Sequence, residues 1–531
     1  MASYVCDSGT WPDVLDLPTG TGKTACIAIA VFHLALAIDA GEKRNAPLRI
    51  AWVVDRRLVV DEAYGVGLRI AKKLYDAHDG LLQRVGAALR KIAGEEEPPL
   101  VVQRLRGGIP REGDWARTPT QPTILSSTVD QIGSRLLFRG YGVSDRMKPV
   151  HAGLLGEDAL IVLDEVHLSE PFRQTLERVA SYERRGPAPW RFLQLSATAR
   201  PDSAQKIFKL DDADRSNATL KMRLDVPKPA KLVMLGRTAY GSESHAERFV
   251  DEVLARAEPH EDGTGKKILV VVNRVGLARR IHDTLRVRGS ASTASLSLVI
   301  GRAREIDKRR VREGILHACK SGAPSLLGAM PSIVVATQCI EAGADLDFDV
   351  LVTQIAPMDS LRQRFGRLNR LGLRVTTQAA ILACDAEVRA SASPDPIYGT
   401  KLRETWTWLQ SRAENSHGLV DFSSSAMGPF AAELTVLASE RADAPVLMPE
   451  HVGAFARTSP IAPWSPDPAL YLHGTEVTLA DVNLVWRADI DAGDDAKGVT
   501  EILSLVPPRS GEVLAMPIGA VRRWLRRGSY D

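Results

Sequence analysis

The stretch that most constrains the fold runs from Pro18 to Thr24 and reads Pro-Thr-Gly-Thr-Gly-Lys-Thr. The apolar lead-in at 14–17 predicts the end of a strand, and the apolar run at 25–38 predicts a helix. Glycines in such a turn let the backbone wrap an anion, while N–H groups and the helix N-terminus point at it. The stretch therefore predicts a phosphate-binding loop in an α/β sheet.

The side chains of this loop fit a nucleotide, ATP, with magnesium. Lys23 would reach the β- and γ-phosphates, and the Thr24 hydroxyl would hold the metal. Leu17 stands where the longer G-x-x-x-x-G-K-[ST] pattern has its first glycine, and a chance turn before a core helix would look similar. The predicted ATP-binding residues of the loop are Thr19, Gly20, Thr21, Gly22, Lys23 and Thr24.

Composition indicates a multi-domain globular protein. A chain of 531 residues is too long for one core and predicts three or so domains. The net charge of +3 excludes a polycation, so any nucleic-acid contact must come from local basic patches. Five scattered cysteines without a C-x-x-C pair favour a reducing cytoplasm over disulfides or structural zinc. The apolar run after Lys23 is too short to span a membrane, so no membrane contact is expected.

A second motif places two adjacent carboxylates after a buried strand. The apolar run 159–163 is followed directly by Asp164 and Glu165. Asp164 would act on magnesium through its water shell, and Glu165 would orient and deprotonate the attacking water. Help of that kind is worth roughly 10²–10⁴-fold in rate. One carboxylate at a strand end is often only solvated, but this pair after a phosphate loop predicts a hydrolytic site.

Other predicted strand ends carry residues that suit a nucleic-acid backbone. Solvated helix starts and plain N-caps explain the same residues. In the first half of the chain, the residues that we assign to nucleic-acid binding are Arg56, Arg57, Arg106, Gly107, Thr128 and Gln131.

After a proline-rich break at 225–229, the second half again shows apolar runs that end in polar residues, which predicts further strands with polar ends. Arginines at 364, 367 and 370 have i, i+3, i+6 spacing, which predicts one helix face, either functional or merely solvated.

The order of the motifs resembles a superfamily-two helicase of the DExH type. The carrying stretches are Pro18–Thr24, Asp164–His167, Ser196–Thr198, Thr337–Asp345 and Gln363–Arg370. The resemblance implies two tandem RecA-like parallel-sheet domains, at 1–228 and 229–392, and a mixed accessory C-terminal domain at 393–531.

The resemblance also implies roles for single residues. Arg367 and Arg370 would face ATP held by the first domain, as arginine fingers worth roughly 10³–10⁵ in rate. Gln363 would sense the γ-phosphate region through His167. Gly343 and Asp345 would approach the nucleotide. Residues that couple the ATP site to the nucleic acid would be His167, Ser196, Ala197 and Thr198. Nucleic-acid contacts of the second domain would be Asn273, Arg274, Arg302, Thr337 and Gln338.

Within that superfamily the chain is similar to the CRISPR-associated helicase–nucleases of type I interference systems, subtype I-U or I-G. The similarity rests on 55–57, 127–131, 164–168, 301–304 and 364–370, with later stretches at 462–474 and 485–489. It implies ATP-driven movement, 3′ to 5′, along the displaced single-stranded DNA after recruitment by the crRNA-guided surveillance (Cascade) complex.

Two departures from that family affect the expected activity. The family's HD nuclease has no counterpart, because the dipeptides His78-Asp79 and His282-Asp283 lack further ligands nearby. We therefore expect no nuclease activity in this chain and a possible separate HD protein. The chain starts 17 residues before the phosphate loop, without a glutamine motif for adenine, so truncation at either end stays an alternative.

The alternative functions are a superfamily-two helicase of DNA repair or RNA, and an ATP-dependent conformational switch without unwinding. The basic end at 522–527 suits DNA or a partner, or is a solvated amphipathic helix.

Overall fold

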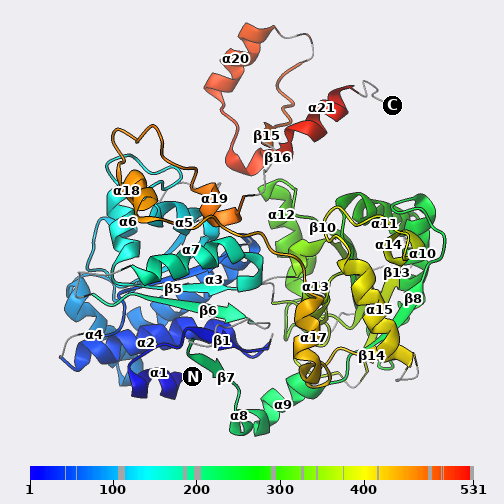
Figure 1. Ribbon diagram of the computed structural model, residues 1–531, viewed down its shortest axis with the longest axis horizontal. Coiled ribbons are helices and arrows are strands. Elements are labelled where there is room, and N and C mark those ends of the chain that lie inside the picture. The colour runs from blue at the N-terminus through cyan, green and yellow to red at the C-terminus, as the bar shows by residue number, and fades with distance from the viewer. Residues whose placement is uncertain are drawn as a thin grey trace.

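The computed structural model describes residues 1–531 except 19, 42–43, 56, 106–113, 183–187, 197–204, 289–294, 325–327, 342–344, 375, 415–417, 476–480, 492, 494 and 527–531. Two lobes lie side by side, each built on a seven-stranded sheet (Figure 1). This arrangement confirms the predicted α/β class with two tandem parallel-sheet domains.

The first sheet has the order β3-β4-β2-β5-β6-β1-β7, and all of its strand pairs are parallel. Its central strands are apolar runs because helices cover both faces. The strands are β1 (Val14–Asp16), β2 (Arg49–Val54), β3 (Val101–Leu105), β4 (Thr123–Thr128), β5 (Ala159–Asp164), β6 (Arg191–Ser196) and β7 (Ile207–Lys209).

Two helical layers bury this sheet. One core contains alternate strand residues with α2 to α4, and the other contains the remaining strand residues with α5 to α7. The helices of the lobe and its exit are α1 (Ala2–Ser8), α2 (Cys26–Asp39), α3 (Arg57–Tyr75), α4 (Gly80–Ala93), α5 (Val129–Leu136), α6 (Lys148–Gly156), α7 (Glu170–Ser181), α8 (Asp212–Ser216) and α9 (Ala218–Asp225).

The second sheet has the order β10-β11-β9-β12-β13-β8-β14, parallel except for the edge strand β14, which runs antiparallel to β8. The strands are β8 (Pro229–Met234), β9 (Lys267–Val271), β10 (Ser295–Val299), β11 (Ser332–Ala336), β12 (Val350–Gln354), β13 (Gln378–Ala383) and β14 (Leu419–Asp421). One face packs on α10 and α11, the other on α13, α15 and α17. Its helices are α10 (Glu243–Leu254), α11 (Val275–Arg288), α12 (Glu305–Val311), α13 (Met358–Phe365), α14 (Asp385–Val388), α15 (Lys401–Glu414), α16 (Ser424–Met427) and α17 (Ala431–Val436).

Residues of the range 393–531, where a single accessory domain is expected, contribute to the hydrophobic cores of both lobes. Trp406, Val420 and Leu437 belong to the core of the second lobe. Phe455 and Tyr471, from α18 (Pro449–Ala456) and α19 (Ala469–His473), belong to that of the first lobe. A small outlying unit then holds a two-stranded sheet, as Figure 1 shows in red. It comprises β15 (Asp481–Leu484), α20 (Ala496–Leu505), β16 (Leu514–Pro517) and α21 (Ile518–Arg526).

In the described part of the chain, every helix is too short or too polar to cross a membrane.

Candidate nucleotide site between the two lobes

Residues of both lobes meet in one pocket at the strand ends of the first sheet. Open α/β sheets bind ligands at that edge. The pocket is lined by Gly20, Gly22, Lys23, Thr24, Trp52, Glu62, Ala63, Asp164, Glu165, Arg367 and Arg370. Motifs that are about 350 residues apart in the sequence thus come together, as the helicase resemblance implies.

The loop has the geometry of an anion cradle. Gly20 and Gly22 adopt φ of 87° and 88°, a left-handed conformation that favours glycine. The hydroxyl of Thr21 donates to the carbonyl of Pro18 at 2.9 Å and closes the turn. The Nζ of Lys23 is buried and makes no hydrogen bond to any described residue. A buried ammonium without an acceptor fits a phosphate, so these residues suit ATP; Thr19 lies outside the described residues.

The two carboxylates stand where β5 ends. The backbone N–H of Glu165 donates to Oδ1 of Asp164 at 3.0 Å, and Glu165 adopts φ of 50°. Burial and the Glu165 charge raise the pKa of Asp164. Burial also acts to raise the pKa of Glu165, but Lys23, His167 and Arg367 outweigh it and the net shift is downward. The environment therefore keeps Glu165 ionised, as a proton acceptor must be.

Gln363 of the second lobe reaches Glu165 directly. Its Nε2 donates to Oε2 of Glu165 at 3.1 Å, and Nδ1 of His167 lies 3.5 Å from the same oxygen. Gln363 thus contacts Glu165 without passing through His167, and its predicted sensing of the γ-phosphate through His167 stays a prediction. The contact links the two lobes at the carboxylate expected to activate water.

The three arginines of the second lobe do not share a helix face, contrary to the prediction. Helix α13 ends at Phe365, and the chain continues through turns in which Asn369 has a φ of 42°. Arg364 therefore points into the core, whereas Arg367 and Arg370 reach the pocket. Burial and Arg370 lower the pKa of Arg367 to about 10, which leaves it charged at neutral pH.

Arg364 is a buried structural residue. Its guanidinium donates to Oε1 of Glu341 at 2.9 Å, to the hydroxyl of Thr353 at 2.8 Å and to Oδ1 of Asn273 at 2.8 Å. We expect Arg364→Ala to lower the free energy of unfolding by about 3–5 kcal/mol, because the carboxylate of Glu341 would stay buried without its partner. Urea denaturation of the variant checks this, and a change near zero would contradict it.

Sequence reasoning missed Glu62, whose carboxylate lines the pocket from α3. Burial and the Asp345 charge raise its pKa. Asp345 pairs with Arg370 at 3.3 Å, so the predicted nucleotide-binding end at Asp345 does lie beside the pocket. The position of Glu62 on the helix after β2 is the signal that could have found it. Gly343 lies outside the described residues.

Three of the predicted nucleic-acid residues line a second, larger cleft. Arg302, Thr337 and Gln338 line this cleft. Asn273 is only 4% exposed and is bonded to Arg364 and to the carbonyl of Ile355, so its predicted contact with nucleic acid is not supported.

The other residues predicted to contact nucleic acid or to couple it to the ATP site do not all line this cleft. Thr128 is buried, Gln131 is bonded to Arg135, and Arg274 pairs with Asp395. Ser196, at the end of β6, lies with His167 in a neighbouring cavity. The backbone of Arg57 begins α3, and its side chain is not described. Arg56, Arg106, Gly107, Ala197 and Thr198 lie outside the described residues.

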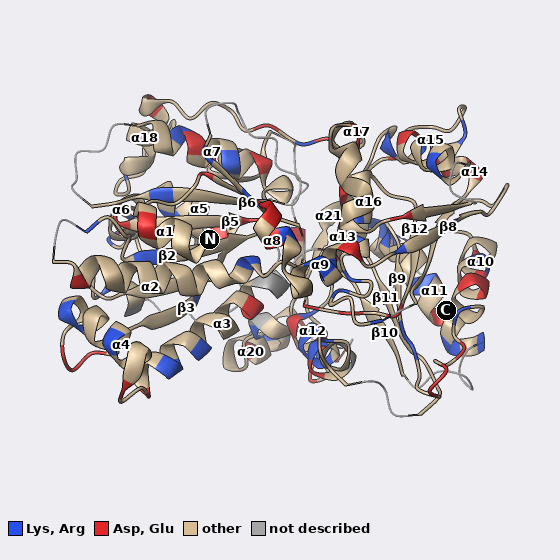
Figure 2. Ribbon diagram, turned by 90° about the horizontal axis from the view of Figure 1, so that it is seen from below, with Lys and Arg blue, Asp and Glu red and all other residues tan. Residues whose placement is uncertain are grey.

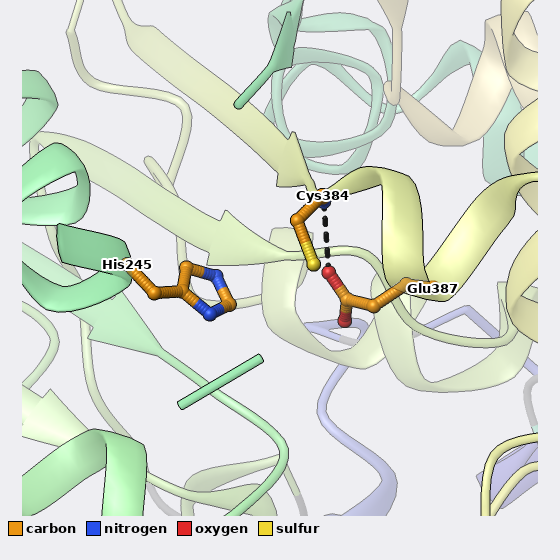
Figure 3. A group of neighbouring side chains, drawn as sticks. All are labelled: His245, Cys384 and Glu387. Atoms are coloured by element: carbon orange, nitrogen blue, oxygen red, sulfur yellow. Dashed lines mark hydrogen bonds between the residues drawn. The ribbon is translucent and has the colours of Figure 1, made fainter. Parts of the chain in front are cut away.

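His245, Cys384 and Glu387 form a buried polar group in the second lobe (Figure 3). The ligand atoms lie within 4.8 Å of one another. However, the N–H of Gly241 donates to Nδ1 of His245 at 3.1 Å, which puts the proton of the neutral ring on Nε2. The N–H of Cys384 donates to Oε2 of Glu387 at 2.9 Å. A metal would need the Nε2 lone pair, which that proton occupies, and Nε2 is buried without a hydrogen bond to any described residue. The group is therefore a neutral polar cluster in the core and carries no metal assignment.

Comparison with known proteins agrees with this geometry. A family model described as CRISPR-associated nuclease/helicase Cas3, C-terminal, matches residues 264–372. The CRISPR-associated helicase Cas3 of Thermoproteus tenax is 27% identical over 376 residues, which are 68% of this chain and 54% of that protein. The chain is similar to the CRISPR-associated Cas3 helicases. The Cas3-related chain thus spans about half the length of this curated relative.

Solved structures support the fold of the Cas3-related chain. The crystal structure of T. fusca Cas3 with AMPPNP matches with a TM-score of 0.58 at 15% identity, covering 97% of this chain and 62% of that one. A chain of a CRISPR RNA-guided surveillance complex, pre-nicking, matches with a TM-score of 0.53 at 15% identity, covering 97% and 62%. The subtype, the expected absence of a nuclease and the domain limits stay predictions.

Proposed function

We propose that the chain is an ATP-dependent translocase or helicase on single-stranded DNA in type I CRISPR interference. The observation that carries the proposal is the pocket in which Lys23, Asp164 and Glu165 of one lobe face Arg367 and Arg370 of the other. Hydrolysis between two lobes changes their relative position, which can move a strand lying across both.

Different residues of the pocket bind the phosphates, accept a proton and neutralise charge. The loop amides and Lys23 hold the phosphates, and Glu165 accepts a proton from the attacking water. Arg367 and Arg370 neutralise charge that develops on the transferred phosphoryl group. Magnesium, which Thr24 and Asp164 would hold, supplies further neutralisation of the phosphate oxygens.

Recruitment by a crRNA-guided surveillance complex is part of the proposal. Its support is the structural neighbour within such a complex, whose similarity covers nearly the whole of this chain. A separate HD nuclease as partner and a cytoplasmic location stay predictions.

The function predicts that single-stranded DNA stimulates ATP hydrolysis. Phosphate release is measured with no nucleic acid, with single-stranded DNA and with an RNA of the same sequence. Stronger stimulation by DNA supports the proposal, whereas preferential stimulation by RNA favours an RNA helicase. Stimulation by neither, with tight ATP binding, favours the conformational switch.

A further inference from the structure

Residues 438–447, here called the strap, cross from the second lobe back to the first. On the second lobe, both the backbone N–H and the hydroxyl of Ser439 donate to Oδ1 of Asp359 at 3.1 Å, in the first turn of α13. On the first lobe, the N–H of Ala444 donates to Oε1 of Gln174 in α7 at 2.8 Å. The strap therefore joins the helix that carries Gln363 to the helix that follows the carboxylate pair.

Arg441 lies within the strap and lines the large cleft that also contains Arg302, Thr337 and Gln338. Its Nη1 donates to Oε2 of Glu170 at 3.3 Å, and the two side chains are only 16% and 13% exposed.

Glu170 is the first residue of α7 and comes directly after the turn that contains His167. His167 in turn lies against Glu165. The Arg441–Glu170 pair thus lies next to the segment that contacts the expected catalytic carboxylate.

Positive charge in this cleft is scarce. Figure 2 shows basic and acidic residues interspersed over both lobes. Among the described residues lining the cleft, Arg302 and Arg441 supply the guanidinium groups, and both are already paired. Nη1 of Arg302 lies 3.2 Å from Oδ1 of Asp481. The lining carboxylates are Asp55, Glu170, Glu341, Asp359 and Glu440. A nucleic-acid phosphate in the cleft would therefore compete with these carboxylates for the arginines.

We propose that Arg441 is the positioning residue through which a single strand in the cleft stimulates ATP hydrolysis. Without nucleic acid, Arg441 holds Glu170 and restrains the turn containing His167. A backbone phosphate takes over the guanidinium, whose planar fork suits phosphate as well as carboxylate. Glu170 is not left unpaired by the exchange, because its Oε1 accepts from Nε of Arg173 at 3.0 Å. The inference rests on the proposed function and adds how a bound strand would regulate ATP hydrolysis.

Two variants that break the same ion pair separate this role from a merely structural one. Arg441→Gln is expected to raise the ATPase rate without nucleic acid several-fold, reduce the stimulation factor and weaken DNA binding. Its slope of log affinity against log salt should fall by about 0.7, the loss of one phosphate contact on a single strand. Glu170→Gln is expected to raise the same basal rate but to leave DNA affinity equal or tighter, because it releases Arg441 for phosphate.

Matched variants complete the experiment. Arg441→Lys keeps a charge for Glu170 and is expected to restore the low basal rate. Arg256→Gln is the control, because it breaks a different Arg–Glu pair. Nη1 of Arg256 lies 2.6 Å from Oε2 of Glu252 in α10. This variant should change neither the ATPase rate nor the DNA affinity. Normal basal rate and normal stimulation in both Arg441→Gln and Glu170→Gln would overturn the inference and leave the proposed function standing. A wild-type chain that no nucleic acid stimulates would overturn the proposed function itself.

Discussion

Glu165→Gln is expected to lower ATP turnover by roughly 10²–10⁴-fold, the contribution of a positioned general base. The amide keeps the size of the side chain and can still bond to Gln363, which donates to Oε2 at 3.1 Å in the wild type. Nucleotide affinity should persist, because Lys23 and the loop amides are untouched. The loss should therefore appear in kcat and not in the dissociation constant for ATP.

Steady-state phosphate release and fluorescent-nucleotide binding measure these two quantities. Glu252→Gln makes the same chemical change on α10, away from the pocket, and should leave both unchanged. Turnover near the wild-type rate in Glu165→Gln would show that another group activates the water, and the catalytic assignment would fail. Lower ATP affinity with unchanged kcat would assign Glu165 to binding instead.

The phosphate loop and the carboxylate pair were predictable because each is a local pattern at a strand end. Parallel strands bring those ends to one edge, so Lys23 and Asp164 meet although about 140 residues separate them. The apolar runs likewise predicted β2, β5 and β9, since strands covered on both faces must be apolar throughout.

The arginines were misplaced because spacing alone cannot show where a helix ends. After Phe365 the chain leaves the helix, so Arg364 enters the core and Arg367 does not follow it on one face. The strap was not predictable, because its function depends on partners far away in sequence, such as Glu170 for Arg441. No local pattern marks either residue.

Arg370→Ala is expected to lower kcat by roughly 10³-fold or more, within the 10³–10⁵ range of arginine fingers. The side chain lines the pocket from the second lobe, and its Nε lies 3.3 Å from Oδ1 of Asp345. That ion pair is partly exposed, at 21% and 31%, so its loss should cost about 1 kcal/mol of stability or less. The backbone N–H of Arg370, which donates to Asp347, survives the substitution.

Arg367→Ala provides the contrast that tests this assignment. Arg367 is buried and donates to the carbonyls of Ile340 at 3.2 Å and Glu341 at 2.7 Å. Each carbonyl left unpaired costs about 1–3 kcal/mol, so this variant should lose activity together with thermal stability. Arg370→Ala should lose activity alone. Arg389→Ala, whose exposed side chain pairs with the partly buried Asp385 on α14, should lose neither activity nor stability. A kcat near wild type in folded Arg370→Ala would contradict the assignment of Arg370 as an arginine finger, because Arg367 would then be the one second-lobe arginine left in that role.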